Sequence, residues 1–114
     1  MSDCLFCGIA GGKIKANIVY QNDAILAFKD IAPKAPVHIL IIPRKHLASV
    51  ADVGDQDRAL IGQIFQAAAE LARDQGIADS GYRIIVNSGA DAGQSVFHLH
   101  YHLLGGRQLS WPPG

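Results

Sequence analysis

The stretch His98-Leu99-His100-Tyr101-His102-Leu103-Leu104 carries histidine at every second position. A β-strand sends alternate side chains to opposite faces, so we expect a strand here whose three imidazoles project from one face. Leu99, Tyr101 and Leu103 then supply the apolar reverse face of a half-buried strand. Of the 5 histidines in the chain, three fall in this stretch. Imidazoles gathered on one face are suited to chemistry at neutral pH.

Apolar patterns upstream of this stretch predict further strands. Residues 18–20 and 24–28 flank Asn22-Asp23, the signature of a hairpin with a tight turn. Residues 38–42 form an Ile-rich run that predicts a strand buried on both faces and ended by Pro43. A strand over 82–87 is also expected, followed by a Gly-containing loop flexible enough to approach a ligand.

One long helix is predicted over residues 55–75. Asp55 and Asp57 suit its N-terminal end, and Gly76 suits its C-terminal stop. Three- and four-residue spacing places the following side chains on one apolar stripe: Leu60, Ile61, Ile64, Phe65, Ala68, Leu71 and Ala72. The order of strands, one helix and strands predicts an α+β domain with a mostly antiparallel sheet.

Composition excludes several classes of protein. A chain of 114 residues suits one domain over residues 1–114, and 49% hydrophobic and 18% charged residues are ordinary for a globular protein. Ten basic residues balance ten acidic ones, which argues against nucleic-acid or membrane-surface binding. The N-terminus lacks the basic and apolar regions of a signal peptide, and residues 39–42 are too short to span a bilayer. We therefore expect a cytoplasmic protein.

The histidine stretch has three interpretations: imidazoles that satisfy backbone groups, a metal site, or nucleophilic catalysis. Neighbouring residues favour the third. Ser95 follows Gln94 just before the stretch, Asn87 ends the preceding predicted strand, and His38 begins another. Neutral donors around imidazoles suit a phosphate ester, and this region shows no acidic cage for magnesium.

These motifs occur together in one known family. With Gln94-Ser95 before it and Gly105-Gly106-Arg107 after it, the histidine stretch resembles the histidine triad nucleotide-binding proteins. The resemblance spans essentially the whole chain, and Trp111-Pro112-Pro113-Gly114 resembles the Hint branch rather than the dinucleoside-polyphosphate hydrolases. The other matching segments are Phe28-Lys29-Asp30-Ile31, Ala35-Pro36-Val37-His38, Ile42-Pro43-Arg44-Lys45-His46 and Asn87-Ser88-Gly89.

The resemblance implies a homodimeric fold of the histidine triad type and hydrolysis of purine nucleoside phosphoramidates to a nucleoside monophosphate and an amine. By the motif, His100 attacks phosphorus and forms a transient nucleotidyl-histidine. His102 lies beside the phosphate with Ser95 and helps proton transfer, while His38 orients the site. A neutral imidazole with a pKa of ~6.5 is well suited to this attack, and the departing amine needs a proton. No metal is required for the chemistry itself.

The resemblance also implies a nucleotide site. Its members are Asp30, Ile31, Asn87, Gln94, Ser95, His100, His102 and Trp111. Asp30 and the backbone near Ile31 would take the ribose hydroxyls, although Asp30 is equally suited to capping a turn. Trp111 would reach across the dimer to the partner's leaving-group pocket, or else cover the dimer core.

Cys4-Leu5-Phe6-Cys7 has two interpretations. The cysteines are small buried hydrophobes, or they are half of a zinc site, since a metal site fits a reducing compartment better than a disulfide does. Some bacterial-type histidine triad proteins hold zinc with such a pair and two histidines, and the matching positions here are His46 and His98. The resemblance thus implies a structural Cys₂His₂ zinc site.

Two residues depart from the family pattern. Tyr101 stands where an aliphatic spacer is usual, so its ring must pack on the reverse face or its hydroxyl must find a partner. Lys15 stands where proline is common. Two further functions stay open: a zinc-stabilised nucleotide-binding or interaction module with incidental hydrolysis, and a hydrolase of dinucleoside polyphosphates.

Overall fold

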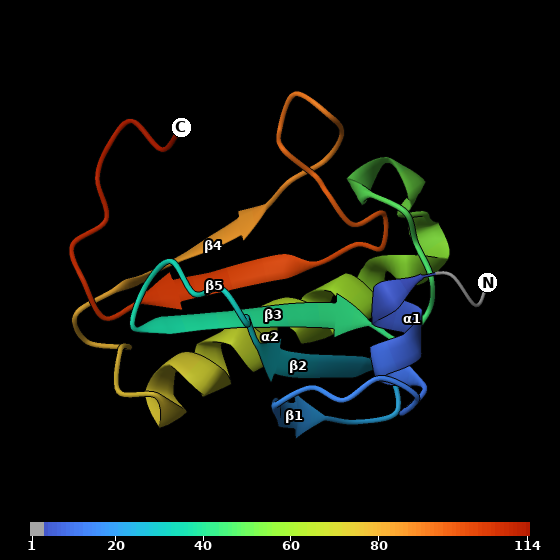
Figure 1. The fold of residues 1–114 in the computed structure, drawn as a ribbon, viewed down its shortest axis with the longest axis horizontal. Coiled ribbons are helices and arrows are strands. Elements are labelled where there is room, and N and C mark those ends of the chain that lie inside the picture. Colours follow the sequence, from blue (N-terminus) through green and yellow to red (C-terminus); the bar gives the residue numbers. More distant parts are fainter. Residues whose placement is uncertain (1–3) are drawn as a thin grey trace.

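Five antiparallel strands form one sheet in the order β1-β2-β3-β5-β4 (Figure 1). The structure is a computed structural model that describes residues 4–114, so the expectation for the extreme N-terminus lies partly outside it. The strands are β1 (Ile18–Gln21), β2 (Ile25–Lys29), β3 (Val37–Pro43), β4 (Tyr82–Val86) and β5 (Tyr101–Gly105). The predicted α+β class with a mostly antiparallel sheet is confirmed.

The hairpin expected around Asn22 is present between β1 and β2. The Asn22 side-chain oxygen accepts hydrogen bonds from the backbone N–H groups of Ala24 and Ile25, at 2.8 and 2.9 Å. An asparagine that bonds its own backbone a few residues ahead fixes a turn locally. This turn sets the register of β2 against β1.

Helix α2 (Arg58–Asp74) covers one face of the sheet, where its apolar stripe meets the main core. The predicted start at residue 55 is too early, because Asp55–Asp57 forms a short 3₁₀ turn, with Val50–Asp52 as another before it. The Asp57 carboxylate accepts from the Gly54 N–H and pairs with Lys45 Nζ at 2.7 Å, which fixes this turn ahead of the helix. Gly76, with φ +74°, ends the helix as expected.

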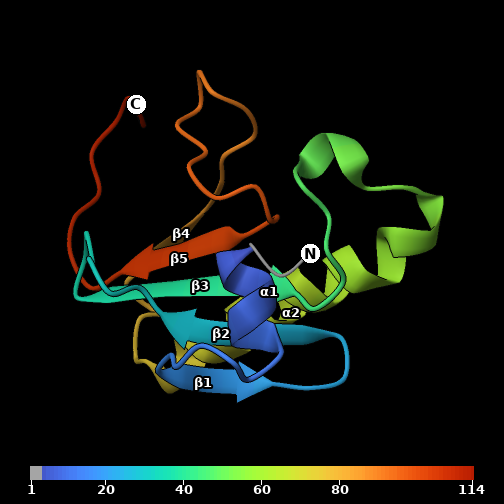
Figure 2. The same ribbon diagram turned by 45° about the vertical axis from the view of Figure 1, so that its right-hand side comes forward.

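A short helix that the sequence analysis did not predict covers the opposite face. Helix α1 (Leu5–Ala10) lies over β2 and β3, as Figure 2 shows. Its two buried side chains, Phe6 and Ile9, join a second apolar cluster with strand residues Leu26, Phe28, Leu40 and Ile42. Because both faces are covered, β3 is buried along nearly its whole length, as its Ile-rich sequence predicted.

The strand predicted from the histidine stretch is wrong at its start, because β5 begins only at Tyr101. Both neighbouring strands stop pairing at Tyr101, and the Leu99 N–H bonds instead to the carbonyl of Leu47 at 2.6 Å. His98 and His100 thus precede the strand and only His102 lies in it. The alternation persists in this segment, because Leu99 and Tyr101 lie in the main core while the histidine rings contact residues outside it.

Tyr101 packs on the reverse face, which is one of the two outcomes expected for it. The side chain is buried in the main core, and its ring meets that of Phe65 edge to face with centroids 5.6 Å apart.

Over residues 4–114, neither helix has the length and apolar character that crossing a bilayer requires.

Candidate active site and metal centre

Two cavities of about 440 Å³ each share Asp30 and His102 in their walls. One is mainly apolar, with α1 forming part of its wall and with Ser95 and His100 in its lining. The other contains His38 and Asn87. Volumes of this size are typical of small-molecule sites. The structure therefore brings together at one place most of the polar residues expected to act there.

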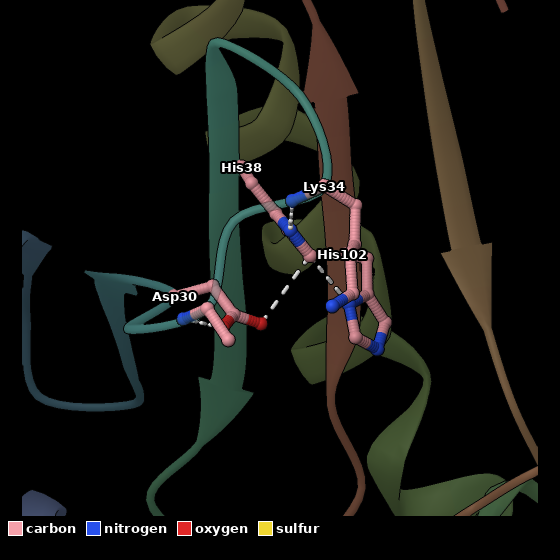
Figure 3. Close-up of polar contacts among 5 residues, drawn as sticks. Asp30, Lys34, His38 and His102 are labelled. Carbon is pink, nitrogen blue, oxygen red and sulfur yellow. Dashed lines mark hydrogen bonds and ion pairs between the residues drawn. The ribbon is translucent and has the colours of Figure 1, made fainter.

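His38 and His102 face each other from adjacent strands. His38 pairs in register with Leu104 on β5, so His102 is its diagonal neighbour on the same face. Figure 3 shows the two rings pointing toward one another, and His38 Nε2 lies 2.9 Å from His102 Nδ1. Asp30 Oδ2 lies 3.4 Å from His38 Nε2 on the other side.

A chain of hydrogen bonds fixes which nitrogen of each ring carries the proton. The Lys34 backbone N–H donates to His38 Nδ1 at 3.0 Å, so neutral His38 carries its hydrogen on Nε2. That Nε2–H donates to His102 Nδ1, and neutral His102 therefore carries its hydrogen on Nε2. Among the described residues, His102 Nε2 is the buried side-chain nitrogen or oxygen atom without a hydrogen-bond partner.

His100 has the opposite tautomer. Its Nδ1–H donates to the His98 carbonyl at 2.7 Å, so Nε2 of the neutral ring holds a free lone pair. The His100 and His102 rings lie side by side with centroids 5.1 Å apart. The site thus presents an imidazole lone pair next to an imidazole N–H donor. A lone pair of this kind can attack phosphorus, while the adjacent donor can bind a phosphoryl oxygen.

A second cluster lies beyond His100, on the side of α1. The ligand atoms of Cys4, Cys7, His46 and His98 lie within 4.8 Å of one another. Sulfur–nitrogen distances are 3.4 Å for Cys4–His98, 3.2 Å for Cys7–His46 and 3.5 Å for Cys7–His98. Tetrahedral zinc, with bonds of about 2.3 Å to sulfur and about 2.0 Å to nitrogen, places such atoms about 3.5 Å apart. The four residues therefore fit a zinc ion.

The tautomer of His98 also fits metal binding. Its Nε2–H donates to the Pro43 carbonyl at 2.8 Å, which leaves the Nδ1 lone pair directed at the two sulfur atoms. Metal-ligating histidines commonly donate their second N–H to a carbonyl or carboxylate in this way. Both cysteines are free thiols. The pKa of Cys7 is raised, mainly by burial and then by its hydrogen bond to Cys4 and the charge of that residue.

Asp30, His38 and His102 form another group with ligand atoms within 4.8 Å, but they do not fit a metal ion. His38 Nδ1 accepts the Lys34 N–H, so the nitrogen that faces the group, Nε2, is protonated. A nitrogen that bears hydrogen has no lone pair for a metal. This cluster is a hydrogen-bond relay.

The comparisons with known proteins identify the family of this chain. The model of the HIT domain matches residues 11–109. This chain belongs to the histidine triad (HIT) family. It is 50% identical over 112 residues, 98% of this chain and 97% of the relative, to an uncharacterized HIT-like protein of Synechocystis sp.. A HIT family hydrolase from Legionella pneumophila Philadelphia 1 is 51% identical with TM-score 0.97, covering 98% of this chain and 100% of that one.

A more distant structure of the family contains zinc. A Zn-bound histidine triad family protein from Mycobacterium smegmatis is 31% identical, with TM-score 0.82, over 96% of this chain and 81% of that one. The comparisons thus establish a HIT fold along nearly the whole chain.

Not every expected residue of this HIT protein reaches the cavities. Gln94 is buried: its oxygen accepts from the Gly89 N–H, and its nitrogen donates to the carbonyls of Ala48 and Val96. It fixes the loop ahead of the histidines and lies in neither cavity wall. Trp111 is 80% exposed and rests against the Arg83 guanidinium, also outside both cavities.

Asp30 caps a turn, which is one of the two roles considered for it, and its second carboxylate oxygen faces His38. Its Oδ1 accepts from the Ala32 N–H at 2.8 Å, which closes the turn, while Oδ2 faces His38. Ile31, fully exposed, lies in the wall of the apolar cavity with Ser95. One carboxylate oxygen is thus structural, and the other is directed into the site.

Sequence reasoning missed two residues that shape this HIT site. Phe6 of α1 lines the apolar cavity and touches the His100 ring, with centroids 5.0 Å apart. Its three-residue spacing from Ile9 was the available signal for a helix. Arg107 donates two hydrogen bonds, at 3.1 and 2.9 Å, to the carbonyl of Lys34, the residue whose N–H sets the His38 tautomer. No sequence pattern indicates that contact.

Acid should destabilise the fold through the histidine relay. Burial, reinforced by repulsion from His100 and His38, lowers the pKa of His102 to about 4, and burial lowers that of His38 despite Asp30. In the unfolded chain each histidine becomes protonated below about pH 6.5. In the folded protein His102 stays neutral until the pH falls to about 4. The stability that the neutral histidines contribute is therefore fully present above pH 6.5 and is lost as the pH drops from 6.5 to 4.

The size of this effect is measurable by urea unfolding. From pH 7.5 to pH 4.5 we expect His102 to account for a loss of roughly 1–2 kcal/mol, after allowance for solvent screening. His102→Gln removes the titrating group, and its unfolding free energy should fall by that much less over the same range. Equal losses in both proteins would contradict the prediction.

Proposed function

We propose that this HIT protein is a hydrolase of purine nucleoside phosphoramidates, of the Hint branch. The observation that carries the proposal is the pair of opposite tautomers in the site. His100 Nε2 offers a lone pair, and His102 Nε2 beside it offers an N–H. A binding module has no need of an imidazole lone pair in a ligand cavity, whereas covalent catalysis at phosphorus requires one.

The reaction proceeds in two displacements. His100 Nε2 forms a bond to phosphorus as the phosphorus–nitrogen bond breaks, and the departing nitrogen takes one proton relayed from solvent through the donors of the site. Water then bonds to phosphorus, the bond to His100 breaks, and the water's proton returns to solvent. The products are a nucleoside monophosphate and an amine. Both steps use only this chain's own residues and water.

The two cavities divide the substrate between them. The apolar cavity, walled by Phe6, Ile9 and Phe28, suits a purine ring, because flat aromatic surfaces pack well against such side chains. Asp30 lies in the wall shared by the two cavities, where ribose hydroxyls can donate to its carboxylate. Asn87 lines the second cavity and supplies an amide for the phosphate or the scissile nitrogen.

A paired turnover assay tests the proposal. Purified protein is given adenosine 5′-phosphoramidate, guanosine 5′-phosphoramidate and a diadenosine polyphosphate at equal concentrations. We expect the phosphoramidates to be hydrolysed fastest. When the nucleotide carries a radiolabel, a labelled nucleotidyl-protein should be detected after the reaction is stopped without acid. Faster cleavage of the polyphosphate would instead indicate the sister hydrolase, while tight nucleotide binding without turnover would indicate a binding module.

We further propose that Cys4, Cys7, His46 and His98 hold a structural zinc ion. The distances, the His98 tautomer and the softness of the thiolates support zinc over magnesium or calcium. When bound, zinc cross-links the N-terminal segment to the histidine segment. Because all four residues are then bound to the metal, His98 takes no part in acid–base catalysis. We also propose a cytoplasmic location, because cysteines that hold zinc suit a reducing compartment.

The protein is also proposed to act as a homodimer. Strand β4 stands at the edge of the sheet and exposes Tyr82 and Val86, while Phe65 and Phe97 are exposed as well. A second copy can extend the sheet at this edge and cover these side chains. Exposed Trp111 is then free to reach the partner's cavity. Sedimentation should give a dimer, and Val86→Lys a monomer; a monomeric wild type would contradict the proposal.

A further inference from the structure

Phe6 lies between the metal centre and the candidate nucleophile. Its ring is buried and meets the His100 ring at 85° with centroids 5.0 Å apart. The same ring meets that of His98 at 6.1 Å and that of Phe28 at 5.5 Å. It therefore contacts one metal-ligating histidine, the attacking histidine and the wall of the apolar cavity.

The position of this ring depends on helix α1. The helix has 6 residues, a length at which an isolated helix is unstable in water. Cys4 is its N-cap and accepts the Cys7 N–H on its sulfur at 3.3 Å, so both thiols belong to the helix framework. At the other end, the Ala10 carbonyl is held by Arg44 at 2.8 Å. Phe6 stands directly before Cys7 in the chain.

Binding of metal thus bears directly on the cavity. An ion held by Cys4 and Cys7 on α1 and by His46 and His98 elsewhere ties the helix to the histidine segment. The same helix carries Phe6 and Ile9 into the wall of the apolar cavity. Without the ion, the N-terminal half of the helix is held mainly by apolar contacts and three weak sulfur–imidazole contacts.

We propose that metal binding at Cys4, Cys7, His46 and His98 strengthens nucleotide binding in the apolar cavity, and that Phe6 is the positioning residue that couples the two sites. The inference rests on the proposed nucleotide and zinc sites. It adds that the metal is a determinant of affinity for the nucleoside as well as of stability. Coupling of this kind is reciprocal, so bound nucleotide must tighten metal binding by the same factor.

The experiment measures both directions of the coupling. The dissociation constant of adenosine 5′-monophosphate is determined by calorimetry on zinc-loaded and chelator-treated protein at low temperature, with circular dichroism to confirm that both are folded. We expect it to rise about 10-fold on removal of zinc, within the range usual for coupled sites. The zinc affinity, measured by chelator competition, should rise about 10-fold when adenosine 5′-monophosphate is present.

Two matched variants distinguish coupling between the metal and nucleotide sites from the loss of an aromatic side chain in the cavity wall. Phe6→Leu keeps all four ligands and should bind zinc, but the metal dependence of nucleotide affinity should shrink to less than about 3-fold. Phe28→Leu removes a ring of the same cavity that, among the described residues, pairs with the ring of Phe6 and with neither histidine ring of the two sites. It should weaken nucleotide binding yet keep the 10-fold metal dependence. H/D exchange over residues 5–10 should rise on chelation in both variants and in the wild type.

Each outcome has one meaning. Equal nucleotide affinity with and without zinc in folded wild type overturns the inference, and so does unchanged metal dependence in Phe6→Leu. Where chelated protein unfolds, the competition measurement on loaded protein decides: nucleotide must raise zinc affinity about 10-fold in Phe28→Leu but less than about 3-fold in Phe6→Leu. A wild type that binds zinc but no nucleotide refutes the proposed function, whereas one that binds nucleotide but no zinc refutes the metal centre; the coupling falls with either.

Discussion

Replacing His100 by alanine is expected to lower kcat for an adenosine phosphoramidate by roughly 10³- to 10⁶-fold, the range seen when an attacking side chain is removed from a covalent catalyst. The loss is large because no other described residue offers a free imidazole lone pair in the apolar cavity. Affinity for adenosine 5′-monophosphate should change by less than about 10-fold, since Phe28 and Asp30 stay in place.

Turnover and binding must be measured on the same preparation to separate the two effects. His100→Gly provides the matched control, because the space left by the side chain admits free imidazole. Added imidazole should restore part of the turnover in the glycine variant and should not accelerate the wild type. Turnover retained in His100→Ala would refute the assignment of the nucleophile, whatever the nucleotide affinity.

Removal of the proposed zinc ion should have the largest effect on stability. Chelation is expected to lower Tm by at least about 10 °C, which for a domain of this size corresponds to a few kcal/mol. The effect is smaller than in a zinc finger because the core around α2 packs without the metal centre. Metal analysis of the freshly purified protein should find about one zinc per chain before chelation.

Cys4→Ser/Cys7→Ser is the matched variant for this prediction. It removes both sulfur ligands and leaves the main core untouched, so it should be purified without zinc. Its Tm should lie near that of the chelated wild type and should not respond to chelator. Absence of zinc from the fresh wild type, together with unchanged melting after chelation, would show that Cys4 and Cys7 are only packing residues.

The local patterns of this sequence were sufficient for most of the fold. Asn22 marked the hairpin turn, the three- and four-residue spacing from Leu60 to Ala72 marked α2, and the Ile-rich run marked a doubly covered strand. Helix α1 was missed because six residues hold too little periodicity to distinguish a helix from a loop. The start of the histidine strand was misplaced because strand ends depend on where partners stop pairing.

The hydrogen-bond arrangement of the candidate site could not be predicted from its residues. Resemblance indicated His38, His100 and His102, but it carried no information on which nitrogen of each ring is protonated. The Lys34 N–H and the His98 carbonyl make that choice. Gln94 stands in the motif, but its amide is bonded to three backbone groups, which the motif did not indicate.

The sequence by itself determined which chemical groups this protein has and on which face of the chain each one lies, because side-chain alternation and helical spacing are local properties of the backbone. Only the tertiary structure decided what those groups do. It brings Cys4 and Cys7 to His98 across more than ninety residues, and it sets the tautomer of His102 through His38, 64 residues away, and that of His98 through the Pro43 carbonyl, 55 residues away. Proton positions and ligand geometry follow from such long-range contacts, which no local periodicity encodes.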